Sequence, residues 1–226
     1  AVAGCVRCLA ALGEWEELDC LLKREWGSLS QQARTECAPM GASSAWQLGN
    51  FDDLTGYIGL LQPHTVDDCF FRALRCVHSG RLDRGEKMLD EVRAALDAEI
   101  TPLLREGYER AYPSIVKSQQ VAELEEALNH RRLLRDGACA PGGPEEIALG
   151  RMWYDRLRAM QPDADYWQTS LAIHRLIVGP QLHRAAWLRY ASVCRLQGRH
   201  NLCCNAILEV AGVAKRGSPS VVFSPG

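Results

Sequence analysis

The sequence lacks the features that would point to a membrane span, a nucleic-acid partner or a chemical reaction. No apolar stretch approaches the roughly 20 residues needed to span a bilayer. The formal net charge of −2 offers no overall attraction to nucleic acid or to an anionic membrane surface. The chain contains no HExxH, no GxSxG and no kinase catalytic-loop motif. We therefore expect neither a catalytic site nor a nucleic-acid partner in this chain.

A regular cysteine pattern is also missing, although the chain has ten cysteines. Cys5 and Cys8 form a single CxxC, without the second Cys or His pair that a zinc site needs or the βαβ context of a redox motif. Others follow or precede apolar residues, as at Cys20, Cys69 and Cys194, and we expect them to pack as small buried hydrophobes. This usage predicts no metal site and favours the reducing cytoplasm over a disulfide scaffold.

Strand-like alternation is absent, whereas apolar residues recur at helical spacing along nearly the whole chain. Thr101 before Pro102, and Gly179 before Pro180, are typical of helix starts. The predicted helices cover residues 1–12, 14–26, 29–48, 51–61, 65–79, 82–97, 101–117, 119–135, 145–160, 163–178, 180–197 and 199–213.

Amphipathic stripes predict which residues these helices bury. In residues 121–128, the apolar side chains of Val121, Leu124 and Leu128 lie on one stripe, and Glu123 and Glu126 lie mostly outside it. Each such stripe has to pack against neighbouring helices. The six histidines are scattered, and we interpret His174, within an apolar run, as a structural residue.

Two stretches share one pattern, CLAALGEWEEL (8–18) and SSAWQLGNFDDL (43–54): an apolar run, Leu-Gly, an aromatic residue and two acids. Glycine adopts the left-handed conformation that ends a helix, as we predict for Gly13 and Gly49. The acids then fall in the first turn of the next helix, where the helix dipole favours negative charge. Trp15, Phe51 and the preceding Trp46 are predicted to pack at these corners between antiparallel helices.

Weaker copies of the corner follow at Gly80 and Gly198. The first three corner glycines lie 36 and 31 residues apart, which brackets the period of about 34 residues of tetratricopeptide repeats. The sequence thus predicts an all-α fold, an α-solenoid of antiparallel helix pairs like those of tetratricopeptide or HEAT repeats. The alternative is a helical bundle whose helices end in glycine.

The chain divides into a helical-repeat segment and a short tail. Residues 1–213 are predicted to form the repeats, interrupted by a flexible loop near 136–144 that lacks the Lys-Ser/Thr of a phosphate-binding loop. Residues 214–226 have the composition of a linker. The helical pattern starts without a cap, so we expect the chain to be part of a longer protein.

Several stretches resemble the FAT region of the target-of-rapamycin (TOR) kinases, in the same order and over nearly the whole chain. The combination of GYERAY, a helix reading AELEEAL, and W-L-x-Y-A-S-x-C is specific to that resemblance. The matching stretches are RCLAALGEWEEL (7–18), SAWQLGNFDDL (44–54), FFRALRCVHSG (70–80), LDAEITPLLREGYERAY (96–112), VAELEEAL (121–128) and parts of 152–199.

The resemblance implies a regulatory scaffold rather than an enzyme in its own right. In such kinases the FAT region is an α-solenoid that clamps the serine/threonine kinase domain, which holds ATP and Mg and is absent here. The implied role is in nutrient and growth signalling. The implied partners are the kinase domain, neighbouring helical repeats and complex subunits such as raptor. The complex would provide any contact with the lysosomal or vacuolar membrane.

The resemblance also implies a ligand, inositol hexakisphosphate, bound by basic side chains. One family lysine falls on Arg189 and a second on Leu196, beside Arg195; a third basic position falls near Pro162 and is lost. A polyanion needs several converging cations. In the alternative interpretation, Arg189 and Arg195 are solvated surface charges.

Two other functions stay open at this point. A free-standing tetratricopeptide adaptor would bind a protein partner in its groove, and it should show polar groove positions that recur at the repeat period. The chain could also be the FAT region of another related kinase, such as one that acts in DNA damage. ELEEAL and W-L-x-Y-A-S-x-C favour the TOR group.

Overall fold

The computed structural model describes residues 2–212, which form α-helices, one short 3-10 helix and no strand. The predicted linker 214–226 lies outside these residues. No described helix is both long and apolar enough to cross a membrane. The elements are α1 (Val2–Leu12), α2 (Trp15–Glu25), η1 (Trp26–Ser28), α3 (Gln31–Leu48), α4 (Phe51–Ile58), α5 (Val66–His78), α6 (Leu82–Glu106), α7 (Tyr108–Arg135), α8 (Pro144–Ala159), α9 (Ala164–His174), α10 (Arg184–Leu196) and α11 (His200–Ala211).

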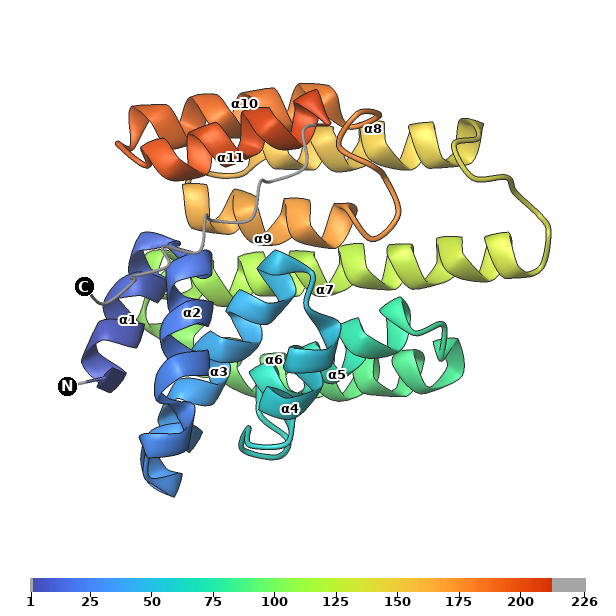
Figure 1. The fold of residues 1–226 in the computed structure, drawn as a ribbon. Coiled ribbons are helices and arrows are strands. Elements are labelled where there is room, and N and C mark those ends of the chain that lie inside the picture. Colours follow the sequence, from blue (N-terminus) through green and yellow to red (C-terminus); the bar gives the residue numbers. More distant parts are fainter. Residues whose placement is uncertain (1, 213–226) are drawn as a thin grey trace.

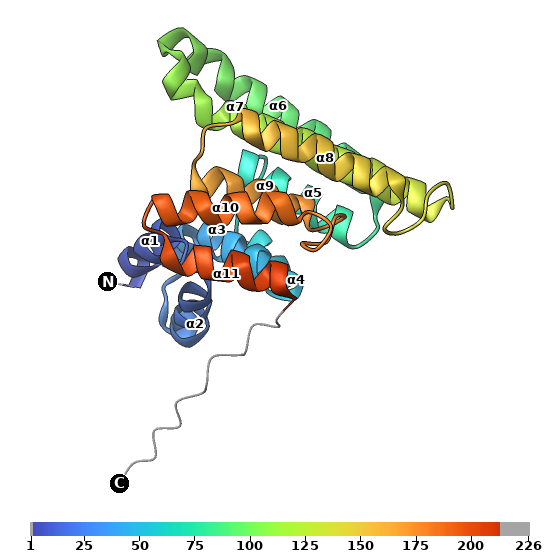
Figure 2. The same ribbon diagram turned by 90° about the horizontal axis from the view of Figure 1, so that it is seen from above.

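Consecutive helices pack as antiparallel pairs, as in α6 with α7 and α10 with α11 (Figure 1). Helix α7 crosses the middle of the molecule and contacts α5 and α6 on one side and α9 on the other. Seen from above, α6, α7 and α8 run along one another, and α9 to α11 lie beside them (Figure 2). The predicted all-α architecture is confirmed. Helix α7 lies between two layers, one that contains α5 and α6 and one that contains α9, and it contacts both.

The four corner glycines share one backbone geometry. The φ angles of Gly13, Gly49, Gly80 and Gly198 are 70°, 78°, 72° and 73°, in the left-handed region predicted for them. At each corner the next residue donates its N–H to the carbonyl five residues before it, as Asn50 does to Ala45 at 2.7 Å. This bond satisfies a carbonyl that the helix end would otherwise leave unpaired. The same local chemistry therefore turns the chain at each corner.

The prediction that a helix starts at Thr101 is wrong. Helix α6 continues through Pro102 to Glu106, and the chain reverses at Gly107 instead. Thr101 does not cap a helix, because its hydroxyl donates to the carbonyl of Asp97 within the same helix. The predicted break at residue 118 is also absent, since α7 is continuous. Packing of α6 along α7 outweighs the hydrogen bond that a proline removes from a helix.

The predicted helix start at Pro180 is likewise wrong. Helix α9 ends at His174, and α10 begins only at Arg184. Between them the chain makes turns, with the N–H groups of Leu182 and His183 both bonded to the carbonyl of Gly179 at 3.0 Å. These turns place His183 against His174 of α9.

Cysteine burial was only partly predicted. Cys69 and Cys194 are buried as expected, but Cys20 is exposed. Leu18 and Leu22 occupy the buried side of α2, and Cys20 lies between them in sequence and therefore on the opposite side of the helix. No cluster of three potential metal ligands occurs among residues 2–212.

Replacing Gly49 with alanine should destabilise the chain by about 1–2 kcal/mol, because an L-residue pays for the left-handed conformation. The matched control is Gly56→Ala in α4, where the glycine is also exposed and a Cβ also meets nothing within 4 Å. Its helical backbone favours alanine, so this variant should be more stable by about 0.5–1 kcal/mol. Urea unfolding measures both; equal changes would contradict the assigned corner geometry.

Candidate functional site

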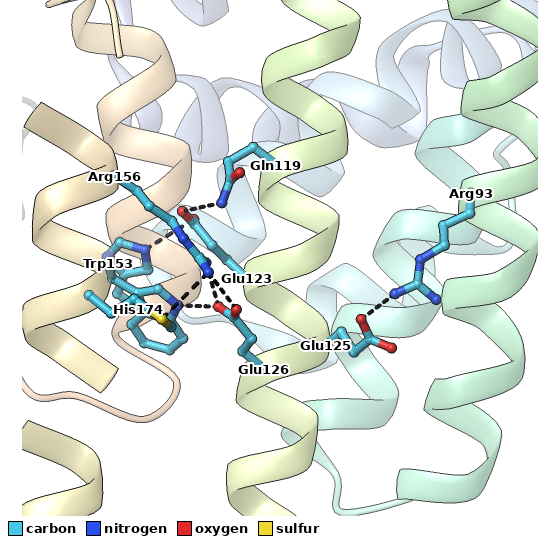
Figure 3. A network of polar contacts seen from close by, with 9 residues as sticks. Arg93, Gln119, Glu123, Glu125, Glu126, Trp153, Arg156 and His174 are labelled. Carbon is cyan, nitrogen blue, oxygen red and sulfur yellow. Dashed lines mark hydrogen bonds and ion pairs between the residues drawn. The ribbon is translucent and has the colours of Figure 1, made fainter. Parts of the chain in front are cut away.

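Polar side chains of α7 reach both neighbouring layers, and we call this region the α7 junction. It comprises Glu123, Glu126 and Arg131 together with their partners on α5, α8, α9 and the turns that follow α9. Figure 3 shows Glu123 and Glu126 pointing toward α8 and α9, while Glu125 points the other way and pairs with Arg93 of α6. The charges of α7 are thus divided between two sides of the same helix.

A fully buried hydrogen-bond chain runs from α7 through α9 to the turn before α10. Glu123 Oε2 lies 3.0 Å from His174 Nε2, and His174 Nδ1 lies 3.2 Å from His183 Nε2. Glu123 and His174 are 0% exposed. Gln119 donates to the other oxygen of Glu123 at 3.3 Å. A buried carboxylate needs such partners, because water cannot solvate it.

The structure changes two expectations about this buried chain, one for Glu123 and one for His174. Glu123 was predicted to lie outside the buried stripe of α7, and this is wrong, because α9 packs over that side and supplies His174. His174 is structural as expected, but it is not isolated. Nothing in the local spacing joins it to Glu123, 51 residues earlier, or to His183 across the turns.

An ion pair fastens α8 to α7. Arg156 donates two hydrogen bonds to Glu126, of 2.7 and 2.8 Å, and Trp153 Nε1 donates a third at 2.7 Å (Figure 3). The bond to Glu126 raises the pKa of Arg156 further. The Trp153 ring also stacks on His174 with centroids 4.4 Å apart, so Trp153 contacts both hydrogen-bond networks. This bidentate geometry fixes orientation as well as distance.

Arginines also bind carbonyls at the C-terminal ends of three helices. Arg131 donates to the carbonyl of His78, the last residue of α5, at 3.4 Å and to that of Leu176, just after α9, at 3.1 Å. Arg175 donates to the carbonyl of Gln47 near the end of α3 at 3.0 Å, and to Glu209 of α11 at 3.3 Å. Helix C-termini carry unpaired carbonyls and partial negative charge, which a guanidinium compensates. These contacts tie both layers together.

The predicted corner residues lie at separate corners rather than in one pocket. Trp46 packs edge-on against Phe70, with ring centroids 5.6 Å apart. Phe51 stacks on His78 with centroids 3.5 Å apart. The carbonyl of Trp15 accepts a hydrogen bond of 2.9 Å from Ser44 of α3. Each aromatic residue thus contacts the adjacent helix pair.

The structure separates the two arginines predicted to bind inositol phosphate. Arg189 lines a cavity of about 510 Å³ together with Arg158, Tyr154 and Pro162, but Arg195 does not line it. The neighbouring Leu196 is 75% exposed. Sequence reasoning missed Arg158, which the contact between α8 and α10 brings to Arg189 and which no local spacing reveals.

Comparison with known proteins gives one family and a consistent set of relatives. The FAT domain family matches residues 38–225. The chain is 32% identical to the serine/threonine-protein kinase mTor of Drosophila melanogaster over 96% of the chain. It is 34% identical to the serine/threonine-protein kinase TOR of Arabidopsis thaliana over 97% of the chain. The serine/threonine-protein kinase ATR of Oryza sativa subsp. japonica is 29% identical over 80% of the chain. The chain spans 8%, 9% and 7% of these relatives, respectively.

Acidification should destabilise the chain through His183. Burial, followed by the neighbouring His174, lowers the pKa of His183 from 6.5 to about 3. Between these values the unfolded state binds a proton that the folded state excludes, so stability falls as the pH drops. From pH 7 to 5.5 this histidine should account for a loss of about 1 kcal/mol.

Chemical unfolding of the His183→Gln variant at both pH values tests this assignment. The variant should be less stable at pH 7 but should lose about 1 kcal/mol less on acidification than the unmodified chain. His200→Gln, at an exposed position, is the control and should keep the original pH dependence. An unchanged dependence in His183→Gln would contradict the assignment.

Proposed function

This chain belongs to the FAT domain family, and on that premise we propose that it is a regulatory and structural scaffold segment of a TOR-type serine/threonine protein kinase. In this proposal its helical repeats clamp the catalytic domain and contribute to nutrient and growth signalling. ATP and Mg bind in the kinase domain, outside this segment. TOR rather than ATR is favoured because the similarity to the TOR kinases covers more of the chain than the similarity to ATR does.

The α7 junction is the observation that best supports a scaffold that transmits strain. Its central groups, Glu123 and His174, are fully buried, so a shift of α9 relative to α7 would leave a charge or a polar atom without its partner. The two layers therefore resist sliding past each other. Close-packed helical repeats pass such displacements to their neighbours.

The proposed partners follow from this role. The segment contacts the kinase domain and the adjoining helical repeats within one protein, and subunits of the complex such as raptor bind the same protein. The proposed location is the cytoplasm, with access to the lysosomal or vacuolar surface through the complex. The alternative is a free-standing adaptor, which would have no kinase activity for a substitution in this chain to alter.

In the full-length kinase, Arg156→Gln should raise basal kinase activity about two- to fivefold, as expected when a coupling of about 0.5–1 kcal/mol is lost. The variant removes the bidentate contact with Glu126 and loosens α8 from α7. Arg151→Gln is the matched control, because Arg151 is an exposed residue of the same helix. Phosphorylation of a peptide substrate measures both. Lower or unchanged activity in Arg156→Gln, together with a measured loss of stability, would refute the clamp.

A bound inositol hexakisphosphate is the second part of the proposal, supported by the cavity in which Arg158 joins Arg189. Calorimetric titration of the chain should show binding that Arg189→Glu weakens at least tenfold, because a repulsive charge replaces an attractive one. Arg195→Glu makes the same charge change on the same helix outside the cavity, and it should weaken binding much less. Equal losses would point to a diffuse surface attraction instead of this cavity.

A further inference from the structure

A cavity of about 370 Å³ lies among the start of α5, the second half of α6 and the first half of α7, three helices that pack against one another (Figure 1). It is separate from the α7 junction and from the cavity that Arg189 lines. Its lining combines apolar and polar side chains, those of Thr65, Val66, Asp67, Leu96, Glu99, Pro113, Ser114 and Lys117. Lys117 is the one cation among these described residues.

The ammonium of Lys117 has weak partners. Its Nζ lies 3.9 Å from the centroid of the Phe70 ring, over the face of that ring. The closest carboxylate oxygen among residues 2–212, Oδ1 of Asp67, also lies 3.9 Å away, which is too far for a hydrogen bond. The Lys117 side chain lines the cavity and is 23% exposed, so a reagent in the cavity can reach it.

These surroundings favour the neutral amine, which is the nucleophilic form of a lysine. Burial lowers the pKa of Lys117, although the carboxylates of Asp67 and Glu99 act in the opposite direction. A charged group that loses water without gaining hydrogen bonds is unfavourable. Lys23 is the opposite case, because Asp19 and Asp53 bind its ammonium at 2.8 and 2.9 Å and raise its pKa.

We propose that Lys117 is an acylation site, at which an uncharged acyl thioester that enters the cavity transfers its acyl group to the lysine amine. The neutral amine attacks the thioester carbonyl, a C–N bond forms and the C–S bond breaks. The sulfur leaves with the electron pair of that bond and takes up the proton that the nitrogen loses, so the products are an amide and a thiol.

The charges of the lining favour an uncharged donor. Asp67 and Glu99 outnumber Lys117, so an anionic donor such as an acyl phosphate is repelled. The amide that forms carries no charge. Acylation therefore removes the ion pair with Asp67 and the cation–π contact with Phe70, both residues of α5, and weakens the packing of α7 on that helix.

Competitive acetylation of the chain near neutral pH, with the acetyl thioester of N-acetylcysteamine as the uncharged donor, tests the site. Peptide mass spectrometry should find Lys117 acetylated at least about fivefold faster than the exposed Lys87, and Lys23 more slowly than both, because the fraction of neutral amine falls in that order. In guanidinium chloride, which unfolds the chain, the three rates should become similar. Acetyl phosphate, which is anionic, should show a smaller preference for Lys117.

Asp67→Asn removes a carboxylate that favours the ammonium, so Lys117 should be acetylated about two- to threefold faster while Lys87 keeps its rate. Asp97→Asn makes the same charge change at an exposed position of α6 outside the cavity, and it should leave the rate at Lys117 unchanged. The proposal is overturned if Lys117 reacts no faster than Lys87 in the folded chain or if its preference persists after unfolding. It is also overturned if acetyl phosphate shows the same preference, or if Asp67→Asn does not speed the reaction.

Discussion

Helix α7 must satisfy two layers at once, and the rest of the structure depends on that constraint. One side carries Glu125, paired with Arg93 of α6, and another carries Glu123 and Glu126, paired with His174 and Arg156. Burying Glu123 is unfavourable unless α9 supplies its partner His174, so this contact requires α9 to pack at this position. Apolar packing supplies most of the stability, and the polar contacts of α7 specify one arrangement of the helices.

The corners and the junction solve the same problem of helix ends in two different ways. At Gly13, Gly49, Gly80 and Gly198 the backbone turns back and pairs its own carbonyls. At the ends of α3, α5 and α9, guanidinium groups from other helices reach further carbonyls. A local solution repeats easily along a chain, whereas a guanidinium from another helix also links distant segments. Membership of the FAT domain family is consistent with a scaffold built from both.

The proposed inositol-phosphate site lies between α8 and α10, away from the corners. Its lining contains two cations, Arg158 and Arg189, which favour an anionic ligand. A ligand bound there would stabilise the spacing of these two helices.

The sequence by itself determined the helical class, most helix ends and the left-handed corners, because these depend on residues within a few positions of one another. It also indicated the family, through stretches such as GYERAY and AELEEAL. The burial of Glu123, the passage of α6 through Pro102 and the position of Arg158 and Arg189 at one cavity were decided only by the tertiary structure. So was the exposure of Cys20. Each depends on which helix packs against that residue, and the partner lies too far along the chain for local spacing to reveal it.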